Sequence, residues 1–551
     1  MLKRGVLRLG DSCRKHRDAW LLAGVVLLAA AVRVGLLLGT ERVVWGDEPS
    51  YLWLGRNWIT GRGFTFTGRP DPHHSPLYPM VTGLLYLLTG DMERSSDICY
   101  VLFGALLAVP IFLLARRIYD RGTGLWAALV VSLYPALTGA VLFWGTMTEP
   151  LYLLLCYVGF YAALVAVEEE WLWGYPVAGA CIALAYLTRP EAIGYLAGMV
   201  LFWLGVLVVE RRLLSRRSLG GLALYAGAFL ALVFPYAVFV HGQTGSWQIT
   251  EKAGVTFITC LGLATHDVAA FDRATWGLDS TGHEVFFFSD ESYNVSMVDY
   301  VREHPGEFAR LVVQNVRAFL NYLISPRMLP SLLVPVVALG LWAVPWGRSR
   351  LRRELWLGLT VLPLAGFALF FIQERYIGAV LPTLTIWVAV GLRHLGRWCA
   401  DTWANLSGRG RRLGGALRVA PLVAVLVWFV VALPAEMRGT SVGSYRLGHK
   451  TVGLWLGERV TPETVVMSRY PAIAFYAGTV WRPTPNASVD EMLEYARYKT
   501  VDYLVLDERE TVQMRPQFRP LLDGVELPAP LERVHVDASE GERLVVFRLH
   551  W

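Results

Sequence analysis

Residues 20–39 read WLLAGVVLLAAAVRVGLLLG, and shortly afterwards residues 43–51 read VVWGDEPSY. The first run is apolar and long enough to cross a bilayer, which takes roughly 20 residues of helix. The second run places two adjacent carboxylates, Asp47 and Glu48, just beyond it. Carboxylates beside hydrocarbon are costly and usually have a function. The stretch therefore predicts a membrane helix followed by chemistry at the membrane surface.

The composition extends this interpretation to most of the chain. Of 551 residues, 54% are hydrophobic and only 17% are charged, and the mean hydropathy is +0.42. These values exclude an ordinary soluble globule and predict a multi-pass α-helical membrane protein. About eleven apolar runs approach the length of a bilayer helix. They lie near residues 20–39, 98–115, 123–143, 149–167, 173–187, 192–209, 219–240, 330–346, 355–372, 377–392 and 419–434.

Basic residues set the expected orientation, because loops rich in Lys and Arg stay on the cytoplasmic side. Lys3, Arg4 and further basic residues precede the first run, so the N-terminus is expected inside. With eleven spans the other basic clusters share that side. They lie at 116–117, 211–217, 348–353 and 397–418. The formal net charge of +6 then reflects topology, and no basic patch with interleaved aromatic residues indicates nucleic-acid binding.

Two long segments are expected on the outer side, residues 40–97 and 241–329. In the first, residues 49–59 and 76–88 carry Trp or Tyr and are too short to span comfortably. Both are expected to be helices lying in the membrane interface. The second segment is polar with aromatic clusters and ends in an amphipathic stretch at 307–323. It is expected to cap the outer face.

The sequence changes character after the last apolar run. We assign residues 1–434 to a membrane domain and residues 435–551 to a small extracytoplasmic α/β domain. About 100 residues suffice for one hydrophobic core. Within the second part, residues 489–498 are expected to form a helix. The residues expected to form strands are 464–467, 501–506 and 543–549.

Polar side chains collect at the ends of the runs that this orientation places outside. They are Asp47 and Glu48, His73 and His74, Thr148 and Glu149, Arg189 and Glu191, and Glu374, Arg375 and Tyr376. Any one cluster is ordinarily interfacial anchoring, but their placement on one aqueous side favours a shared site. Arg189 and Arg375 could clamp a phosphate, because guanidinium presents a fork of donors. Asp47 could accept a proton from a hydroxyl.

The order of these motifs resembles a known superfamily. Asp-Glu-x-x-Tyr follows the first run, Pro-Leu-Tyr-Pro lies in the first outer segment, Thr-Glu-Pro opens the fourth run, Thr-Arg-Pro-Glu follows the fifth and Glu-Arg-Tyr precedes the tenth. This order is similar to that of the GT-C membrane glycosyltransferases, above all the family 39 branch of protein O-mannosyltransferases and lipid A aminoarabinose transferases. The resemblance covers the whole membrane region and implies a GT-C-like fold for residues 1–434.

The resemblance also implies a function. It implies an enzyme that transfers a sugar, with inversion, from a polyprenyl-phosphate carrier to a lipid, glycan or protein acceptor on the outer side of the membrane. Asp47 is then the general base, and Glu48 supports it or contacts the acceptor. Arg189 and Arg375 are the positional candidates for the donor phosphate, with Lys252 of the second outer segment as a further candidate. The residues expected to line the substrate are Tyr51, His73, His74, Glu149, Glu191, Glu374 and Tyr376.

Two questions stay open at the level of sequence. No cofactor is required by this chemistry and no metal ligands are assigned, although a divalent metal near His73 and His74 is an alternative. A polytopic transporter or lipid flippase of the cell envelope is the rival function class, and it would place its site at the bilayer midplane between repeated halves. An inert scaffold subunit of an envelope complex is a third class. All three predict location in the cell (inner or plasma) membrane.

Overall fold

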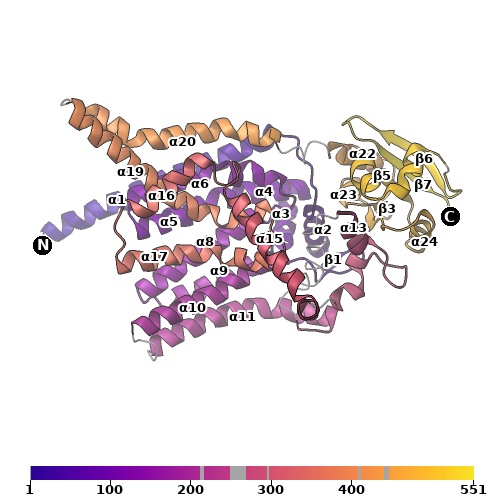
Figure 1. The fold of residues 1–551 in the computed structure, drawn as a ribbon, viewed down its shortest axis with the longest axis horizontal. Helices are drawn as coiled ribbons and strands as arrows, with labels where there is room; N and C mark the ends of the chain where they lie inside the picture. Colours follow the sequence, from indigo (N-terminus) through magenta and orange to yellow (C-terminus); the bar gives the residue numbers. More distant parts are fainter. Residues whose placement is uncertain are drawn as a thin grey trace.

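Helices dominate the computed structural model, which describes residues 2–210, 216–247, 268–294, 297–407, 411–439, 446–525 and 527–551. Long helices lie side by side along the longest axis of the molecule (Figure 1). A smaller unit of strands and short helices, coloured yellow, lies at one end of them and contains the C-terminus. The N-terminus lies at the opposite end. The chain is therefore a mostly helical body with a small C-terminal α/β domain, as the sequence predicts.

Six helices in the described part of the chain are long and apolar enough to cross a membrane, judged by length and composition. They are Arg17–Leu38, Met92–Ile118, Glu149–Glu168, Pro190–Val209, Arg217–Thr244 and Leu413–Pro434. The elements that form them are α1 (Leu2–Leu38), α4 (Met92–Leu106), α5 (Ala108–Ile118), α8 (Glu149–Glu168), η2 (Pro190–Ala192), α10 (Ile193–Val209), α11 (Arg216–Thr244) and α20 (Arg411–Gly439). Each corresponds to one of the predicted apolar runs.

The other five predicted runs are also helical, but their helices are shorter, interrupted or more polar. In the run at 123–143, Pro135 follows Tyr134, which has the extended angles φ −60° and ψ 120°. Proline restricts the residue before it to such angles, so the helix ends there. The elements are α6 (Arg121–Leu133), α7 (Pro135–Thr138), η1 (Ala140–Phe143), α9 (Gly174–Thr188), η5 (Ser331–Leu333), α16 (Val334–Trp342), α17 (Arg348–Gly358), η6 (Leu359–Val361), α18 (Leu362–Ala368), η7 (Glu374–Ala379) and α19 (Leu381–Ser407).

Several of the basic loops meet at the end of the helices away from the α/β domain (Figure 1). Arg117 and Arg353 both pair with Glu168, at 2.6 and 2.8 Å between nitrogen and oxygen. Arg217 pairs with Glu170 at 3.1 Å. These ion pairs bring together loops that the orientation rule assigns to one side of the membrane. The assignment of that side to the cytoplasm stays a prediction.

The first outer segment forms two helices, α2 (Glu48–Ile59) and α3 (Leu77–Thr89), joined by the short hairpin of β1 (Thr65–Phe66) and β2 (Arg69–Pro70). Both expected helices are confirmed. They cross at two glycines. A Cβ atom on Gly55 would lie 2.3 Å from the carbonyl oxygen of Pro79, and one on Gly83 would lie 2.6 Å from that of Gly55. The two helices therefore pack backbone against backbone.

The α/β domain is built on a five-stranded mixed sheet of order β4-β3-β5-β7-β6. Its strands are β3 (Val465–Ser468), β4 (Val480–Pro483), β5 (Tyr503–Asp507), β6 (Leu531–Asp537) and β7 (Leu544–Leu549). Along β5, Leu504 and Leu506 face a core with α24 (Val489–Tyr498), whereas Val505 faces α22 (Leu447–Gly457) and α23 (Ala472–Ala477). The three strands and the helix expected from sequence are confirmed, and β4 and β6 are additional.

The second outer segment covers part of this domain. Asp272 in α13 (Val268–Trp276) is fully buried between Arg469, at 2.6 Å, and Arg515, at 2.8 Å. The amphipathic stretch at 307–323 lies in the helix α15 (Pro305–Leu323), as expected. The remaining elements are η3 (Phe286–Phe288), η4 (Asp290–Asn294), α14 (Met297–Glu303), η8 (Glu508–Val512), η9 (Pro516–Phe518) and α25 (Arg519–Asp523).

Candidate active site

The loop that carries Asp47 is fixed against the loop that precedes α8. The backbone N–H groups of Asp47 and Glu48 both donate to the carbonyl oxygen of Gly145, at 2.9 and 3.0 Å. Gly46 and Gly145 have φ angles of +65° and +71°, which favour glycine. A Cβ atom on Gly46 would lie 2.8 Å from the Gly145 oxygen. The contact fixes the backbone of the loop. Asp47 is the N-cap residue of α2, and its side chain is exposed.

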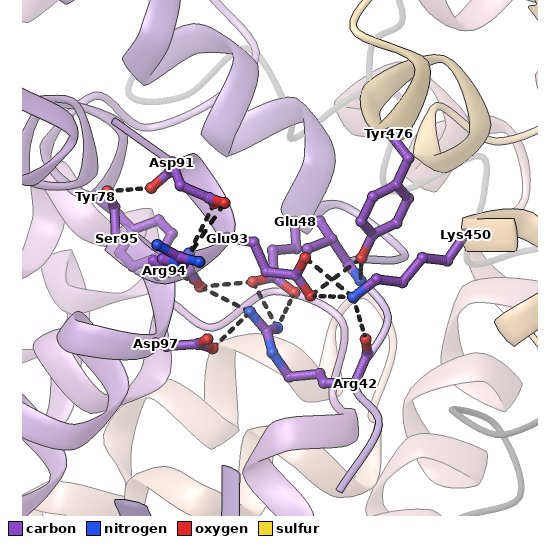
Figure 2. Close-up of polar contacts among 12 residues, drawn as sticks. Arg42, Glu48, Tyr78, Asp91, Glu93, Arg94, Ser95, Asp97, Lys450 and Tyr476 are labelled. Atoms are coloured by element: carbon purple, nitrogen blue, oxygen red, sulfur yellow. Dashed lines mark hydrogen bonds and ion pairs between the residues drawn. The ribbon is translucent and has the colours of Figure 1, made fainter. Parts of the chain in front are cut away.

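Glu48 has a different environment, although it is the next residue. Its side chain is buried, and its carboxylate accepts hydrogen bonds from Arg42 at 2.7 and 2.8 Å and from the hydroxyl of Ser96 at 2.6 Å. Arg42 also pairs with Asp97 at 3.0 Å (Figure 2). Burial lowers the pKa of Arg42, but the nearby carboxylates of Glu48 and Asp97 raise it by more, so the net pKa lies above the ordinary value and the guanidinium stays charged. The acidic pair is thus one exposed carboxylate and one held in a buried ion pair.

A second set of charges lies at the start of α8. Nη1 of Arg189 donates to Glu149 at 2.6 Å and to the hydroxyl of Thr148 at 3.2 Å, and its Nε donates to Glu191. The hydroxyl of Thr146 donates to Glu149 at 2.7 Å. A carboxylate at a helix N-terminus also interacts favourably with the helix dipole. The charge of Arg189 is therefore matched by two carboxylates.

Arg375 lies beside this set. Its Nη1 donates to the carbonyl oxygen of Trp144 at 3.2 Å, directly before the glycine that holds the Asp47 loop. The ring of Tyr376 lies 5.3 Å from Arg375 and 5.8 Å from Arg189, so it contacts both guanidinium groups. Burial lowers the pKa of Arg375, while Tyr376, Asp47 and Glu149 raise it, with a net increase. The charge of Asp47 therefore acts on this arginine.

Arg375 also has unused donor capacity. Its Nε is buried and has no hydrogen-bond partner. Among the residues that the structure describes, no carboxylate lies within ion-pair distance of it, whereas Arg189 has two. A buried donor without an acceptor is costly. The Nε edge of Arg375 is thus suited to an anionic ligand.

The remaining predicted site residues lie elsewhere. His74 contacts Asp71 at 3.1 Å and lies edge-on to Tyr51, with ring centroids 5.0 Å apart. His73 packs against Phe287 at 4.7 Å. These residues form an aromatic group around α2. Glu374 accepts from Arg327 at 3.1 Å and from Ser325 at 3.2 Å, and Lys252 lies outside the described residues.

A group of possible metal ligands lies in the α/β domain. His449, Asp507 and Glu542 are buried, and their ligand atoms lie within 4.8 Å of one another. An imidazole with two carboxylates could hold a divalent cation. The three residues come from α22, from β5 and from the turn before β7, and no spacing in the sequence connects them. The predicted metal alternative at His73 and His74 is distinct from this group.

Sequence reasoning missed the partners of Glu48. Arg42 offered a weak signal, because it is a basic residue at the outer end of an apolar run, close to the acidic pair. Ser96 and Asp97 lie in the second turn of α4 and carry no recognisable motif. Only the packing of α4 against the loop reveals their role.

Comparison with known proteins bears on the fold. The family model for dolichyl-phosphate-mannose-protein mannosyltransferases matches residues 73–241, a segment that includes Glu149, Arg189 and Glu191. A search of curated proteins found no match. Among solved structures, ArnT from Cupriavidus metallidurans bound to undecaprenyl phosphate superimposes with a TM-score of 0.55 at 16% identity, covering 96% of this chain and 97% of that one.

Archaeal structures are similar as well. The oligosaccharyltransferase AglB from Archaeoglobus fulgidus, in complex with an inhibitory peptide and a dolichol-phosphate, has a TM-score of 0.52 at 14% identity, covering 90% of this chain and 70% of that one. The Archaeoglobus fulgidus oligosaccharyltransferase in complex with Zn and sulfate has a TM-score of 0.55 at 14% identity, covering 89% and 68%. The chain therefore has the fold of the GT-C membrane glycosyltransferases, as the order of its motifs predicts.

Proposed function

We propose that this protein is a membrane glycosyltransferase that moves a sugar from a polyprenyl-phosphate carrier to an acceptor hydroxyl. The observation that carries the proposal is the meeting of the exposed side chain of Asp47 with the Glu149–Arg189 pair and the open donor edge of Arg375. The shared fold with ArnT and the family match over residues 73–241 support it. The sugar acceptor is a lipid, glycan or protein.

In this mechanism Asp47 is the general base. The acceptor oxygen attacks the anomeric carbon, the bond from that carbon to the phosphate oxygen breaks, and the proton of the acceptor hydroxyl passes to Asp47. A single displacement inverts the anomeric centre. Asp47 suits this step because it is exposed, while Glu48 is engaged by Arg42 and Ser96. Glu48 then supports the loop.

The departing polyprenyl phosphate gains negative charge as the bond breaks. Arg375 is our assignment for its main partner, because fixed donors aimed at developing charge lower the barrier. Arg189 contributes through Tyr376 and by holding Glu149 and Glu191 apart from the leaving group. Neither step requires a metal ion, because the arginines supply positive charge at the leaving phosphate.

Location belongs to the same proposal. The basic loops lie at one end of the helices and the α/β domain at the other (Figure 1), as expected if residues 435–551 and the site face the outer side of the cell membrane. The same proposal divides the chain into residues 1–434 and residues 435–551. A carrier phosphate resides at headgroup depth, where the helix ends that carry the site would also lie.

The test is sugar transfer in reconstituted vesicles. Purified protein is supplied with a radiolabelled polyprenyl-phosphate sugar and acceptor lipids or glycans, and labelled product is counted. We expect Asp47→Asn to lower the rate about a hundredfold to ten-thousandfold, the typical effect of removing a general base. Glu41→Gln is the matched control, because it removes an exposed carboxylate from the same loop. Wild-type turnover by a folded Asp47→Asn protein would refute the mechanism.

A further inference from the structure

The α/β domain holds the loop that carries the proposed general base. Residues 41–45 form neither helix nor strand, so their backbone groups need partners elsewhere. The N–H of Val44 donates to the hydroxyl of Tyr476 at 2.8 Å, and Nζ of Lys450 donates to the carbonyl oxygen of Arg42 at 3.2 Å. Tyr476 lies in α23 and Lys450 in α22. Two side chains of the α/β domain thus bind the backbone of this loop.

The same two side chains share a third partner. Nζ of Lys450 lies 3.1 and 3.2 Å from the carboxylate oxygens of Glu93, and the Tyr476 hydroxyl donates to Glu93 at 3.2 Å. Figure 2 shows both residues reaching from the α/β domain toward this carboxylate. Glu93 lies in the first turn of α4, the helix whose Ser96 and Asp97 hold the other side of the loop. The loop is therefore held between α4 and the α/β domain.

These contacts are poorly suited to stabilising the whole fold. The side chains of Lys450 and Glu93 are 31% and 20% exposed, and both line a groove of about 530 Å³. A partly solvated ion pair contributes little to stability. Val44, in contrast, is fully buried, so its N–H requires the Tyr476 acceptor. The contacts therefore act mainly on the local order of the loop.

We propose that Lys450 and Tyr476 are positioning residues for the transfer reaction. They hold the backbone leading to Asp47, so that its carboxylate stays at the distance that proton transfer requires. Neither residue contacts the Arg375 donor edge or the Glu149–Arg189 pair. A misplacement of about 1 Å at a reacting group lowers the rate on the order of a hundredfold. This inference rests on the proposed function, because it assigns Asp47 as the base.

The first experiment measures turnover of full-length Tyr476→Phe and Lys450→Met in vesicles. We expect kcat to fall about 10- to 100-fold, as for a displaced catalytic group, with unchanged donor affinity in both variants and unchanged thermal stability in Lys450→Met. Lys450→Arg should keep most of the rate. Lys499→Met is the control, since Lys499 pairs with Glu284 and joins the same domain to the second outer segment. It should turn over like the wild type.

The second experiment follows backbone hydrogen exchange of residues 42–48 by mass spectrometry. Exchange should speed up in Tyr476→Phe and Lys450→Met and stay unchanged in Lys499→Met. Unchanged kcat together with unchanged exchange would overturn the inference, and so would exchange that rises throughout the α/β domain with a lower melting temperature. Full activity of Asp47→Asn would instead refute the proposed function, while the exchange data still report on the loop.

Discussion

Replacing Arg375 with lysine is the most informative perturbation of the proposed donor site. One of its terminal nitrogens, Nη1, is used by the carbonyl of Trp144. The Nε–Nη2 edge is left for a phosphate, which it can bind through two parallel hydrogen bonds. Lysine keeps the positive charge but presents a single ammonium group without the fork. The substitution therefore removes one charge-assisted hydrogen bond from the bound state and leaves the electrostatics in place.

The size of the effect follows from that count. A hydrogen bond to a charged group contributes roughly 1.5–3 kcal/mol. At about 1.4 kcal/mol for each factor of ten, donor affinity should fall about 10- to 150-fold in Arg375→Lys. The acceptor does not bind this edge, so its apparent affinity should not change.

The assay is binding of undecaprenyl phosphate to detergent-solubilised protein, followed by native mass spectrometry, together with the apparent donor KM in vesicles. Arg353→Lys is the control, because Arg353 pairs with Glu168 at 2.8 Å at the end of the helices away from the α/β domain. Wild-type donor affinity in Arg375→Lys would refute the assignment of Arg375 as the partner of the carrier phosphate. An equal loss in both variants would point to a general effect of the substitution.

Two further predictions concern packing contacts, and a third concerns topology. Gly145→Ala should lower the free energy of unfolding by at least about 1 kcal/mol and should also lower kcat, because φ at Gly145 is +71° and a Cβ atom would lie 3.0 Å from the ring of Trp45. Thermal unfolding and turnover measure the two effects. Wild-type stability and turnover in this variant would contradict the loop geometry. Asp272→Asn should destabilise the protein by about 3–5 kcal/mol, since two buried arginines lose their partner; a melting temperature equal to that of the wild type would exclude this. Ser539→Cys, at an exposed turn of the α/β domain, should react with an impermeant thiol reagent in intact cells, and labelling only after lysis would reverse the proposed topology.

The sequence predicts the gathering of polar motifs better than their roles. The lengths of the apolar runs and the positions of the basic loops indicate which helix ends share a side of the membrane. The sequence therefore assigns Glu149, Arg189 and Arg375 to one region. Whether a neighbouring carboxylate is exposed or buried depends on side-chain direction at the start of α2. Asp47 and Glu48 are indistinguishable in sequence, and only the packing of Arg42 and α4 separates them.

The strands were predicted where burial is high and missed where it is low. β5 has four consecutive buried residues, and β7 has five buried among six, which produce clear apolar runs. β6 is an edge strand whose side chains are mostly exposed, and its sequence LERVHVD is largely polar. Edge strands commonly carry charges that prevent further pairing. β4 contains proline and has only four residues, so its sequence resembles a loop.

The contacts of Lys450 and Tyr476 with the Asp47 loop determine when this loop can become ordered during synthesis. The loop is translated long before its partners Lys450 and Tyr476, which lie about 400 residues later in the sequence, after Arg375. A partly synthesised chain already in the membrane can meet carrier lipids without an ordered base to act on them. Under the proposed mechanism, catalytic competence then arises only after the α/β domain has folded against this loop.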